Sequence, residues 1–215
     1  MKQYKKIIFD IDDTLLPWKK EYWETLENAL SKYDIEFNDE LITNIIKSIN
    51  RTVNEEVKFS GHAVLNAINI DNNLSLKKDV IIEWVNQLSH LSYIELETVE
   101  TLKYLDEKYQ LYALTNFFTK SQVNRLENAE VLKYFTSVCG IDNVKAKPSS
   151  EAFDLVVTGD SEDYLIVGDR IETDITGGNN YGIDTCWLNK NGAINESNIT
   201  PTYEIKSISE LMTLL

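Results

Sequence analysis

Residues 5–16 read KKIIFDIDDTLL, a short apolar run that ends in a cluster of acids. A run of this kind is typical of a strand that is buried on both faces of a parallel sheet. Asp10 and Asp12 alternate along the strand, so their carboxylates point the same way. Two like charges on one face repel each other unless a cation lies between them. We therefore expect a buried strand over residues 5–12, ending either in a metal-binding pair of acids or in a solvated acidic turn in which Asp13 caps a helix.

Three further segments repeat the pattern of an apolar run followed by polar residues: 110–116 (QLYALTN), 163–169 (DYLIVGD) and 184–189 (DTCWLN). Helical patterns lie between them over residues 97–108, 121–128, 150–157 and 173–181, and the tail from Tyr203 suits a last strand and a short helix. Strands that alternate with helices predict an α/β fold, with a parallel sheet covered by helices on both faces. Ligands of such sheets bind beyond the carboxyl ends of the strands, where these polar residues lie.

Residues 17–95 show only helical patterns. An amphipathic stretch covers residues 18–33, a second helix begins after Asn38 as its N-cap, and a third, which Ser75 can cap, carries an apolar face over residues 80–88. We therefore expect an all-helical cap of residues 17–95, inserted into a core of residues 1–16 plus 96–215.

Polar residues beside the other predicted strands could assist the acids of the first one. Thr115 and Asn116 offer a hydroxyl and an amide to phosphate oxygens, although they could simply cap the next helix. Lys147 precedes a proline and is therefore extended, although it could be an exposed loop lysine, and Lys145 competes with it.

Two more acids, Asp169 and Asp174, follow the strand predicted at 163–169, and Asp174 could merely cap the next helix. The chain thus reads acid-acid, Thr, Lys, acid-acid in order. This order resembles the haloacid dehalogenase-like hydrolase superfamily, in its phosphatase branch. The resemblance covers the whole chain, through FDIDDTLL (9–16), LTN (114–116), KPSSEAF (147–153) and VGDRIETDITGGNNYGIDTCWLN (167–189).

The resemblance implies a Rossmann-like, doubly wound core with an inserted helical cap, and a role for each matched residue. Asp10 resembles the nucleophile, and Asp12 resembles the general acid and base. The implied metal ligands are Asp10, Asp12 through its backbone carbonyl, and Asp169, with Asp174 in support; the implied phosphate-binding residues are Thr115, Asn116 and Lys147. The family often has Gly where this chain has Asp13.

The implied reaction is the magnesium-dependent hydrolysis of small phosphate monoesters through a phosphoaspartyl intermediate on Asp10. Mg²⁺ and Lys147 would offset the charge of the transferring phosphoryl group, and Asp12 must be protonated when an alkoxide leaves. Oxygen-only ligands suit Mg²⁺ better than zinc. Phosphomutases share all these residues. A dehalogenase is disfavoured by Asp12, because a leaving halide needs no proton. A non-catalytic receiver-like module would be shorter and would lack the helical insert.

The combination of FDIDDTLL (9–16) with GDRIETDITGGNNYGIDTCWLN (168–189) most resembles the pyrimidine 5′-nucleotidase branch, which implies substrates such as UMP, dUMP and dTMP. The base should meet the cap, where Trp18, Phe59, Phe117 and Phe118 are candidates for stacking, although each is more simply explained by packing. A sugar phosphate or 2-phosphoglycolate is the alternative substrate.

The 21 basic and 35 acidic residues give a net charge of −14, which disfavours nucleic acid and anionic membranes as partners. The same charge repels anionic substrates, so the small phosphorylated metabolite that the resemblance implies as the partner would need local cations to hold it. Two cysteines, with neither a run of apolar residues long enough to span a membrane nor a signal peptide, favour the cytoplasm. The oligomeric state is left open.

Overall fold

The computed structural model describes residues 3–18, 21–33, 38–54 and 58–215. Six strands form one sheet in the order β3-β2-β1-β4-β5-β6, and every neighbouring pair is parallel. The strands are β1 (Lys6–Phe9), β2 (Gln110–Leu114), β3 (Phe135–Cys139), β4 (Tyr164–Gly168), β5 (Asp184–Leu188) and β6 (Tyr203–Ile205). The predicted parallel sheet is confirmed, and β3 is the strand that the sequence patterns did not predict.

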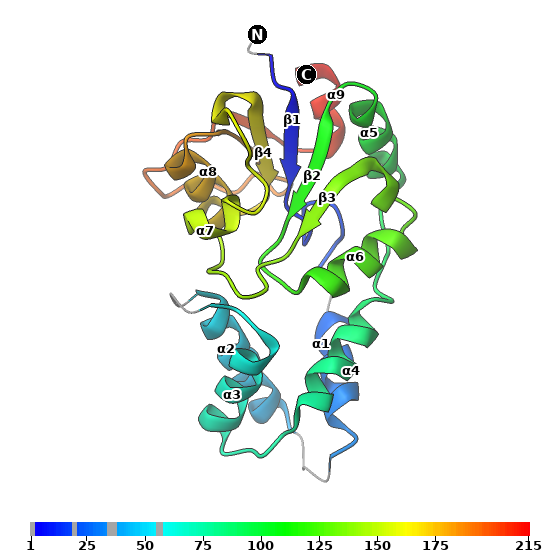
Figure 1. Ribbon diagram of the computed structural model, residues 1–215, viewed down its shortest axis with the longest axis vertical. Helices are drawn as coiled ribbons and strands as arrows, with labels where there is room; N and C mark the ends of the chain where they lie inside the picture. Colours follow the sequence, from blue (N-terminus) through cyan, green and yellow to red (C-terminus); the bar gives the residue numbers. More distant parts are fainter. Residues whose placement is uncertain (1–2, 19–20, 34–37, 55–57) are drawn as a thin grey trace.

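Helices cover both faces of the sheet, as predicted for a doubly wound α/β fold. One face carries α5 (Leu96–Asp106), α6 (Thr119–Asn128) and α9 (Leu211–Leu214), and the other carries α7 (Ser150–Phe153) and α8 (Thr176–Tyr181) (Figure 1). Strand alternation explains the division, because Ile7 and Phe9 pack on the first face and Ile8 on the second.

Two predicted helices differ from the structure in extent. The helix expected over residues 150–157 is only the single turn α7, and the one expected over 173–181 is a π-helical turn, Ile171–Ile175, followed by α8. Short 3₁₀ turns cover Leu132–Tyr134, Ser161–Asp163 and Ile208–Glu210.

Between β1 and α5, the described residues form four helices: α1 (Glu21–Leu30), α2 (Asp39–Asn54), α3 (Gly61–Asn72) and α4 (Lys78–Leu88). Figure 1 shows them gathered beyond the ends toward which β1, β2 and β3 point. No strand occurs among the described residues of 17–95. The boundaries of the cap, which include positions 19–20, 34–37 and 55–57 outside the described residues, stay a prediction.

The N-terminal capping residues of α2, α3 and α4 agree only in part with those that the sequence patterns predicted. Asn38 caps α2 as predicted, because its Oδ1 accepts a hydrogen bond of 2.8 Å from the Leu41 N–H. The prediction for Ser75 was wrong, since α4 begins at Lys78 after Lys77. Helix α3 was not predicted; it begins after Ser60, whose hydroxyl accepts a bond from the Ala63 N–H.

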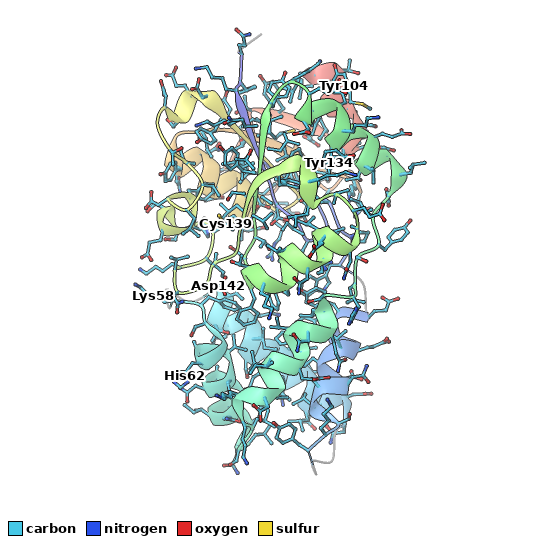
Figure 2. The ribbon with its side chains drawn as sticks, turned by 45° about the vertical axis from the view of Figure 1, so that its right-hand side comes forward. Lys58, His62, Tyr104, Tyr134, Cys139 and Asp142 are labelled. Atoms are coloured by element: carbon cyan, nitrogen blue, oxygen red, sulfur yellow. The ribbon has the colours of Figure 1, made fainter. Side chains whose placement is uncertain are left out.

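The cap helices contact the core through a short backbone pairing. The Phe59 N–H donates to the Val144 carbonyl over 3.0 Å, and the Asn143 N–H donates to the Phe59 carbonyl over 2.7 Å. Lys58 and Asp142 lie on either side of this junction (Figure 2). In the described part of the chain, none of the helices combines the length and the apolar character that crossing a bilayer requires.

Candidate active site

The carboxyl ends of β1, β2 and β4 converge on one pocket of about 400 Å³. Phe9 in β1 lies opposite both Ala113 of β2 and Val167 of β4, so the residues that follow these strands meet at the same level of the sheet. All seven predicted site residues line the pocket: Asp10, Asp12, Thr115, Asn116, Lys147, Asp169 and Asp174. The structure therefore brings together residues that lie up to 164 positions apart, from 10 to 174, in the sequence.

Lys147 is a buried cation whose three N–H groups all have acceptors. Its Nζ lies 2.7 Å from Asp10 Oδ1, from Asp174 Oδ1 and from the Leu114 carbonyl. Burial lowers the pKa of this ammonium, but the charges of Asp10 and Asp174 outweigh burial, so the pKa is raised overall. The alternative of an exposed loop lysine is wrong, since only 3% of Lys147 is exposed.

Asp10 is buried, 7% exposed, rather than part of a solvated acidic turn. Burial raises the pKa of its carboxyl, the charge of Lys147 lowers it, and the neighbouring acids raise it again; the result lies well above the ordinary value. The site therefore disfavours a charged Asp10 unless further positive charge is present.

A group of three acids could share a cation. One carboxylate oxygen from each of Asp10, Asp169 and Asp174 lies within 4.8 Å of the other two. Burial, followed by the charges of Asp174 and Asp13, raises the pKa of Asp169 to about 7. Gly168 makes the close approach possible, because a Cβ at this position would lie 2.4 Å from the Asp174 carboxyl carbon.

The three acids differ in how many of their oxygens already have protein donors. Asp174 accepts from Lys147 through Oδ1 and from the Arg170 N–H through Oδ2. Asp10 accepts from Lys147 through Oδ1, and Asp169 accepts a long bond of 3.4 Å from Thr14 through Oδ1 and a further bond from its own backbone N–H. Among the described residues, the carboxylates of Asp10 and Asp169 thus each have a single side-chain donor, which leaves lone pairs open to a cation.

Asp12 has a donor on each carboxylate oxygen, and both donors come from helix α6. Arg125 Nη1 lies 2.5 Å from Oδ1, and Gln122 Nε2 lies 2.6 Å from Oδ2. The sequence patterns missed Gln122 and Arg125. The signal available was weak: two polar residues three positions apart lie on one side of a predicted helix, and both prove to be fully buried.

Thr115 and Asn116 contact protein groups in this structure. The Thr115 hydroxyl accepts from Gln122 Nε2 over 3.1 Å. The Asn116 amide pairs with the backbone of Lys147, accepting from its N–H over 2.8 Å and donating to its carbonyl over 3.0 Å. Asn116 thus holds the lysine loop against the end of β2. Phosphate binding by Thr115, Asn116 and Lys147 stays a prediction.

Asp13 occupies a backbone conformation that favours glycine. Its φ is 62°, in the left-handed region, which agrees with the glycine that the family often has there. Its Oδ1 accepts from the Trp18 N–H over 2.7 Å, so the side chain secures the turn that leads toward α1.

The cap supplies a mostly apolar wall to the same pocket. The lining residues from this part of the chain are Trp18, Trp23, Ile46, Ile49, Asn50 and Val53. Phe117 from the core joins them, whereas Phe59 and Phe118 pack against each other outside the pocket, with ring centroids 4.7 Å apart. Trp18 and Phe117 therefore remain candidates for contact with a substrate, and Phe59 and Phe118 do not.

Comparison with known proteins identifies the family. A family model described as haloacid dehalogenase-like hydrolase matches residues 7–188. YfnB of Bacillus subtilis (strain 168), named as a HAD-hydrolase, is 29% identical over 236 residues, which cover 100% of this chain and 97% of YfnB. The crystal structure of YfnB bound to magnesium gives a TM-score of 0.75 at 22% identity, and the match covers 100% of this chain and 99% of that one.

Two other relatives have a named reaction. The pyrimidine 5′-nucleotidase PynA of Streptococcus pneumoniae (strain ATCC BAA-255 / R6) is 35% identical over 116 residues, covering 52% of this chain and 49% of PynA. The N-acylneuraminate-9-phosphatase of Homo sapiens is 31% identical over 150 residues, covering 66% of this chain and 60% of that protein. The matched segments thus span only part of these two relatives.

Proposed function

This chain belongs to the haloacid dehalogenase-like hydrolase family, and we propose that it is a phosphatase that hydrolyses small phosphate monoesters. The observation that carries the proposal is the pairing of Asp10, held by Lys147, with Asp12 in one pocket. A phosphate ester leaves as an alkoxide, which needs a proton, and Asp12 is a suitable donor. A leaving halide needs none, so Asp12 favours phosphate over halide chemistry.

In the proposed mechanism, a carboxylate oxygen of Asp10 attacks phosphorus and forms an acyl phosphate. The bond from phosphorus to the ester oxygen breaks, and that oxygen takes the proton from Asp12. Water then attacks the phosphorus of the phosphoaspartate, Asp12 accepts a proton from this water, and inorganic phosphate leaves as the Asp10 carboxylate is restored. Lys147 keeps Asp10 in place and offsets negative charge throughout.

The acids of the pocket fit a magnesium ion, because they are hard oxygen ligands and two of them, Asp10 and Asp169, have a single side-chain donor each. Asp10, Asp169 and the Asp12 backbone carbonyl would hold it, while Asp174, whose oxygens already have donors, supports Lys147. When bound, magnesium supplies positive charge that stabilises the transferring phosphoryl group. The magnesium bound to YfnB supports this assignment.

We further propose that the substrates are pyrimidine nucleoside 5′-monophosphates. Similarity to PynA supports this choice, and so does the apolar wall of Trp18, Trp23 and Val53, against which a flat base can lie. Similarity to the N-acylneuraminate-9-phosphatase makes a sugar phosphate the second candidate. Both candidates are small phosphorylated metabolites. Both cysteines are free, and a cytoplasmic location stays a prediction.

A phosphate-release screen of the purified chain tests both the proposed phosphatase activity and the proposed preference for pyrimidine nucleotides. The substrates are UMP, dUMP, dTMP, AMP, glucose 6-phosphate and 2-phosphoglycolate, each with magnesium and with excess chelator. We expect release only with magnesium, and a kcat/KM for the pyrimidine nucleotides about tenfold or more above the others. Asp169→Ala should raise the magnesium concentration required for half-maximal rate.

Each outcome of the screen has a separate meaning. If glucose 6-phosphate or 2-phosphoglycolate is the best substrate, the nucleotide assignment is wrong and the phosphatase assignment stands. Full activity in excess chelator would mean that the reaction does not require a metal ion. If no ester in a broad panel releases phosphate, the phosphatase assignment itself is wrong.

A further inference from the structure

Arg125 is a buried cation that the mechanism described above does not use. Its exposed fraction is 1%, and it projects from the middle of helix α6. A buried guanidinium is costly unless its N–H groups find acceptors, so its partners show what it holds in place.

The partners of Arg125 belong to three different parts of the molecule. Nη1 lies 2.5 Å from Asp12 Oδ1 and 2.8 Å from Gln122 Oε1, and Nε lies 2.7 Å from the Leu91 carbonyl. The guanidinium carbon is also 5.3 Å from the ring centroid of Tyr22, in cap helix α1. One planar group thus joins Asp12 to the linker between α4 and α5 and to the cap.

The geometry points to Arg125 as the positioning residue for Asp12, an inference that rests on the proposed phosphatase function. A general acid must bring its oxygen within hydrogen-bond reach of the leaving oxygen, and a short acidic side chain that is 17% exposed could otherwise rotate away. The guanidinium donates in fixed directions within one plane, so holding Asp12 Oδ1 while anchored at Leu91 restricts that rotation. Gln122 restrains the second oxygen from the same helix.

The same contacts relate Asp12 to the cap linker. Helix α6 also binds this linker at a second position. Asn128 Nδ2 donates to the Ser89 carbonyl over 2.7 Å, and Asn124 Nδ2 donates to the Ser89 hydroxyl over 3.1 Å. Of these contacts, only those of Arg125 also reach Asp12. Asn128 therefore offers a matched control: it ties the same linker to the same helix without touching the acid.

The experiment compares leaving groups in kcat/KM, which reports phosphoryl transfer to Asp10 and excludes the later hydrolysis step. UMP needs a proton on its leaving oxygen, whereas acetyl phosphate does not. Arg125→Lys should lower kcat/KM for UMP by about 30-fold or more and for acetyl phosphate by less than about threefold. The ratio between the two substrates is independent of the fraction of folded enzyme, so a loss of stability cannot produce the effect.

Two controls complete the design. Asn128→Ala should leave the ratio of the two substrates at its wild-type value. The Asp12→Asn variant should already show the full selective loss of kcat/KM for UMP. Adding Arg125→Lys to it should therefore lower kcat/KM for UMP little further. Equal losses on both substrates in Arg125→Lys, or the same selective loss in Asn128→Ala, would overturn the inference. A wild-type enzyme without phosphatase activity would instead overturn the proposed function.

Discussion

Asp10 is an acid in surroundings that disfavour its own charge. Burial and three nearby acids raise the pKa of its carboxyl, and Lys147 offsets only part of that effect. For an acid, a folded-state pKa above the unfolded value means that the charged form lowers the free energy of unfolding at pH 7. A group kept at such a cost to stability is typical of a functional site.

At the residue scale, we predict that Asp10→Asn abolishes turnover without weakening the fold. The neutral amide removes both the nucleophile and the buried charge, and Lys147 keeps Asp174 and the Leu114 carbonyl as acceptors. The melting temperature in excess chelator should therefore equal or exceed that of the wild type, as measured by calorimetry. Activity above a few per cent of wild type, once deamidation to Asp has been excluded by mass spectrometry, would remove Asp10 from the nucleophilic role.

At the scale of elements, helix α2 supplies most of the residues by which the cap lines the pocket. Among them, Asn50 is the one polar side chain that the described part of the cap contributes. Its amide can both donate and accept, which matches the edge of a uracil, thymine or cytosine. We predict that Asn50→Ala lowers kcat/KM for UMP and dTMP by about tenfold, with little effect on p-nitrophenyl phosphate. Steady-state phosphate release measures both.

The matched control for Asn50 lies on the same helix. Asn44 does not line the pocket, so Asn44→Ala should leave both substrates unaffected. An equal loss of both substrates in Asn50→Ala would mean that the residue supports the helix and does not contact the base.

The strands and helices also differ in how well the sequence patterns predict them. Strand β1 could be predicted because a buried central strand is a continuous apolar run, whereas β3 lies at the sheet edge, is only partly buried and leaves no such run. Helix α3 did carry a signal, with buried Val64, Ala67 and Ile68 at helical spacing, but its polar neighbours obscured it.

The residues of the candidate site likewise fall into those that could be placed from the sequence and those that could not. Residues that follow parallel strands meet at one edge of the sheet whatever the details of packing, so Asp10, Thr115 and Asp169 could be placed from the sequence. The contacts of Gln122 and Arg125 with Asp12 depend on how α6 rotates and packs against the strand ends, and no spacing rule gives that rotation.

At the scale of the whole molecule, the charge opposes the proposed reaction. A protein with a net charge of −14 repels a phosphate dianion on approach, and the cations near the reacting group are few. Salt shortens the range of this repulsion, since the Debye length falls from about 30 Å at 0.01 M to about 8 Å at 0.15 M ionic strength. Monovalent salt should therefore help the substrate to reach the pocket.

We predict that kcat/KM for UMP, at saturating magnesium, rises about threefold between 0.01 M and 0.15 M sodium chloride while kcat changes little, because screening acts on the encounter and not on the bound complex. Sucrose at equal osmolality should have no such effect. The variant Glu107→Lys with Glu162→Lys changes the net charge by 2 + 2, from −14 to −10, at exposed positions near the amino ends of β2 and β4, opposite the site. This variant should be faster than wild type in low salt and less sensitive to added salt. A fall in kcat/KM with salt would mean that local cations such as Lys147 and Arg170, and not the charge of the whole molecule, govern the approach of the substrate.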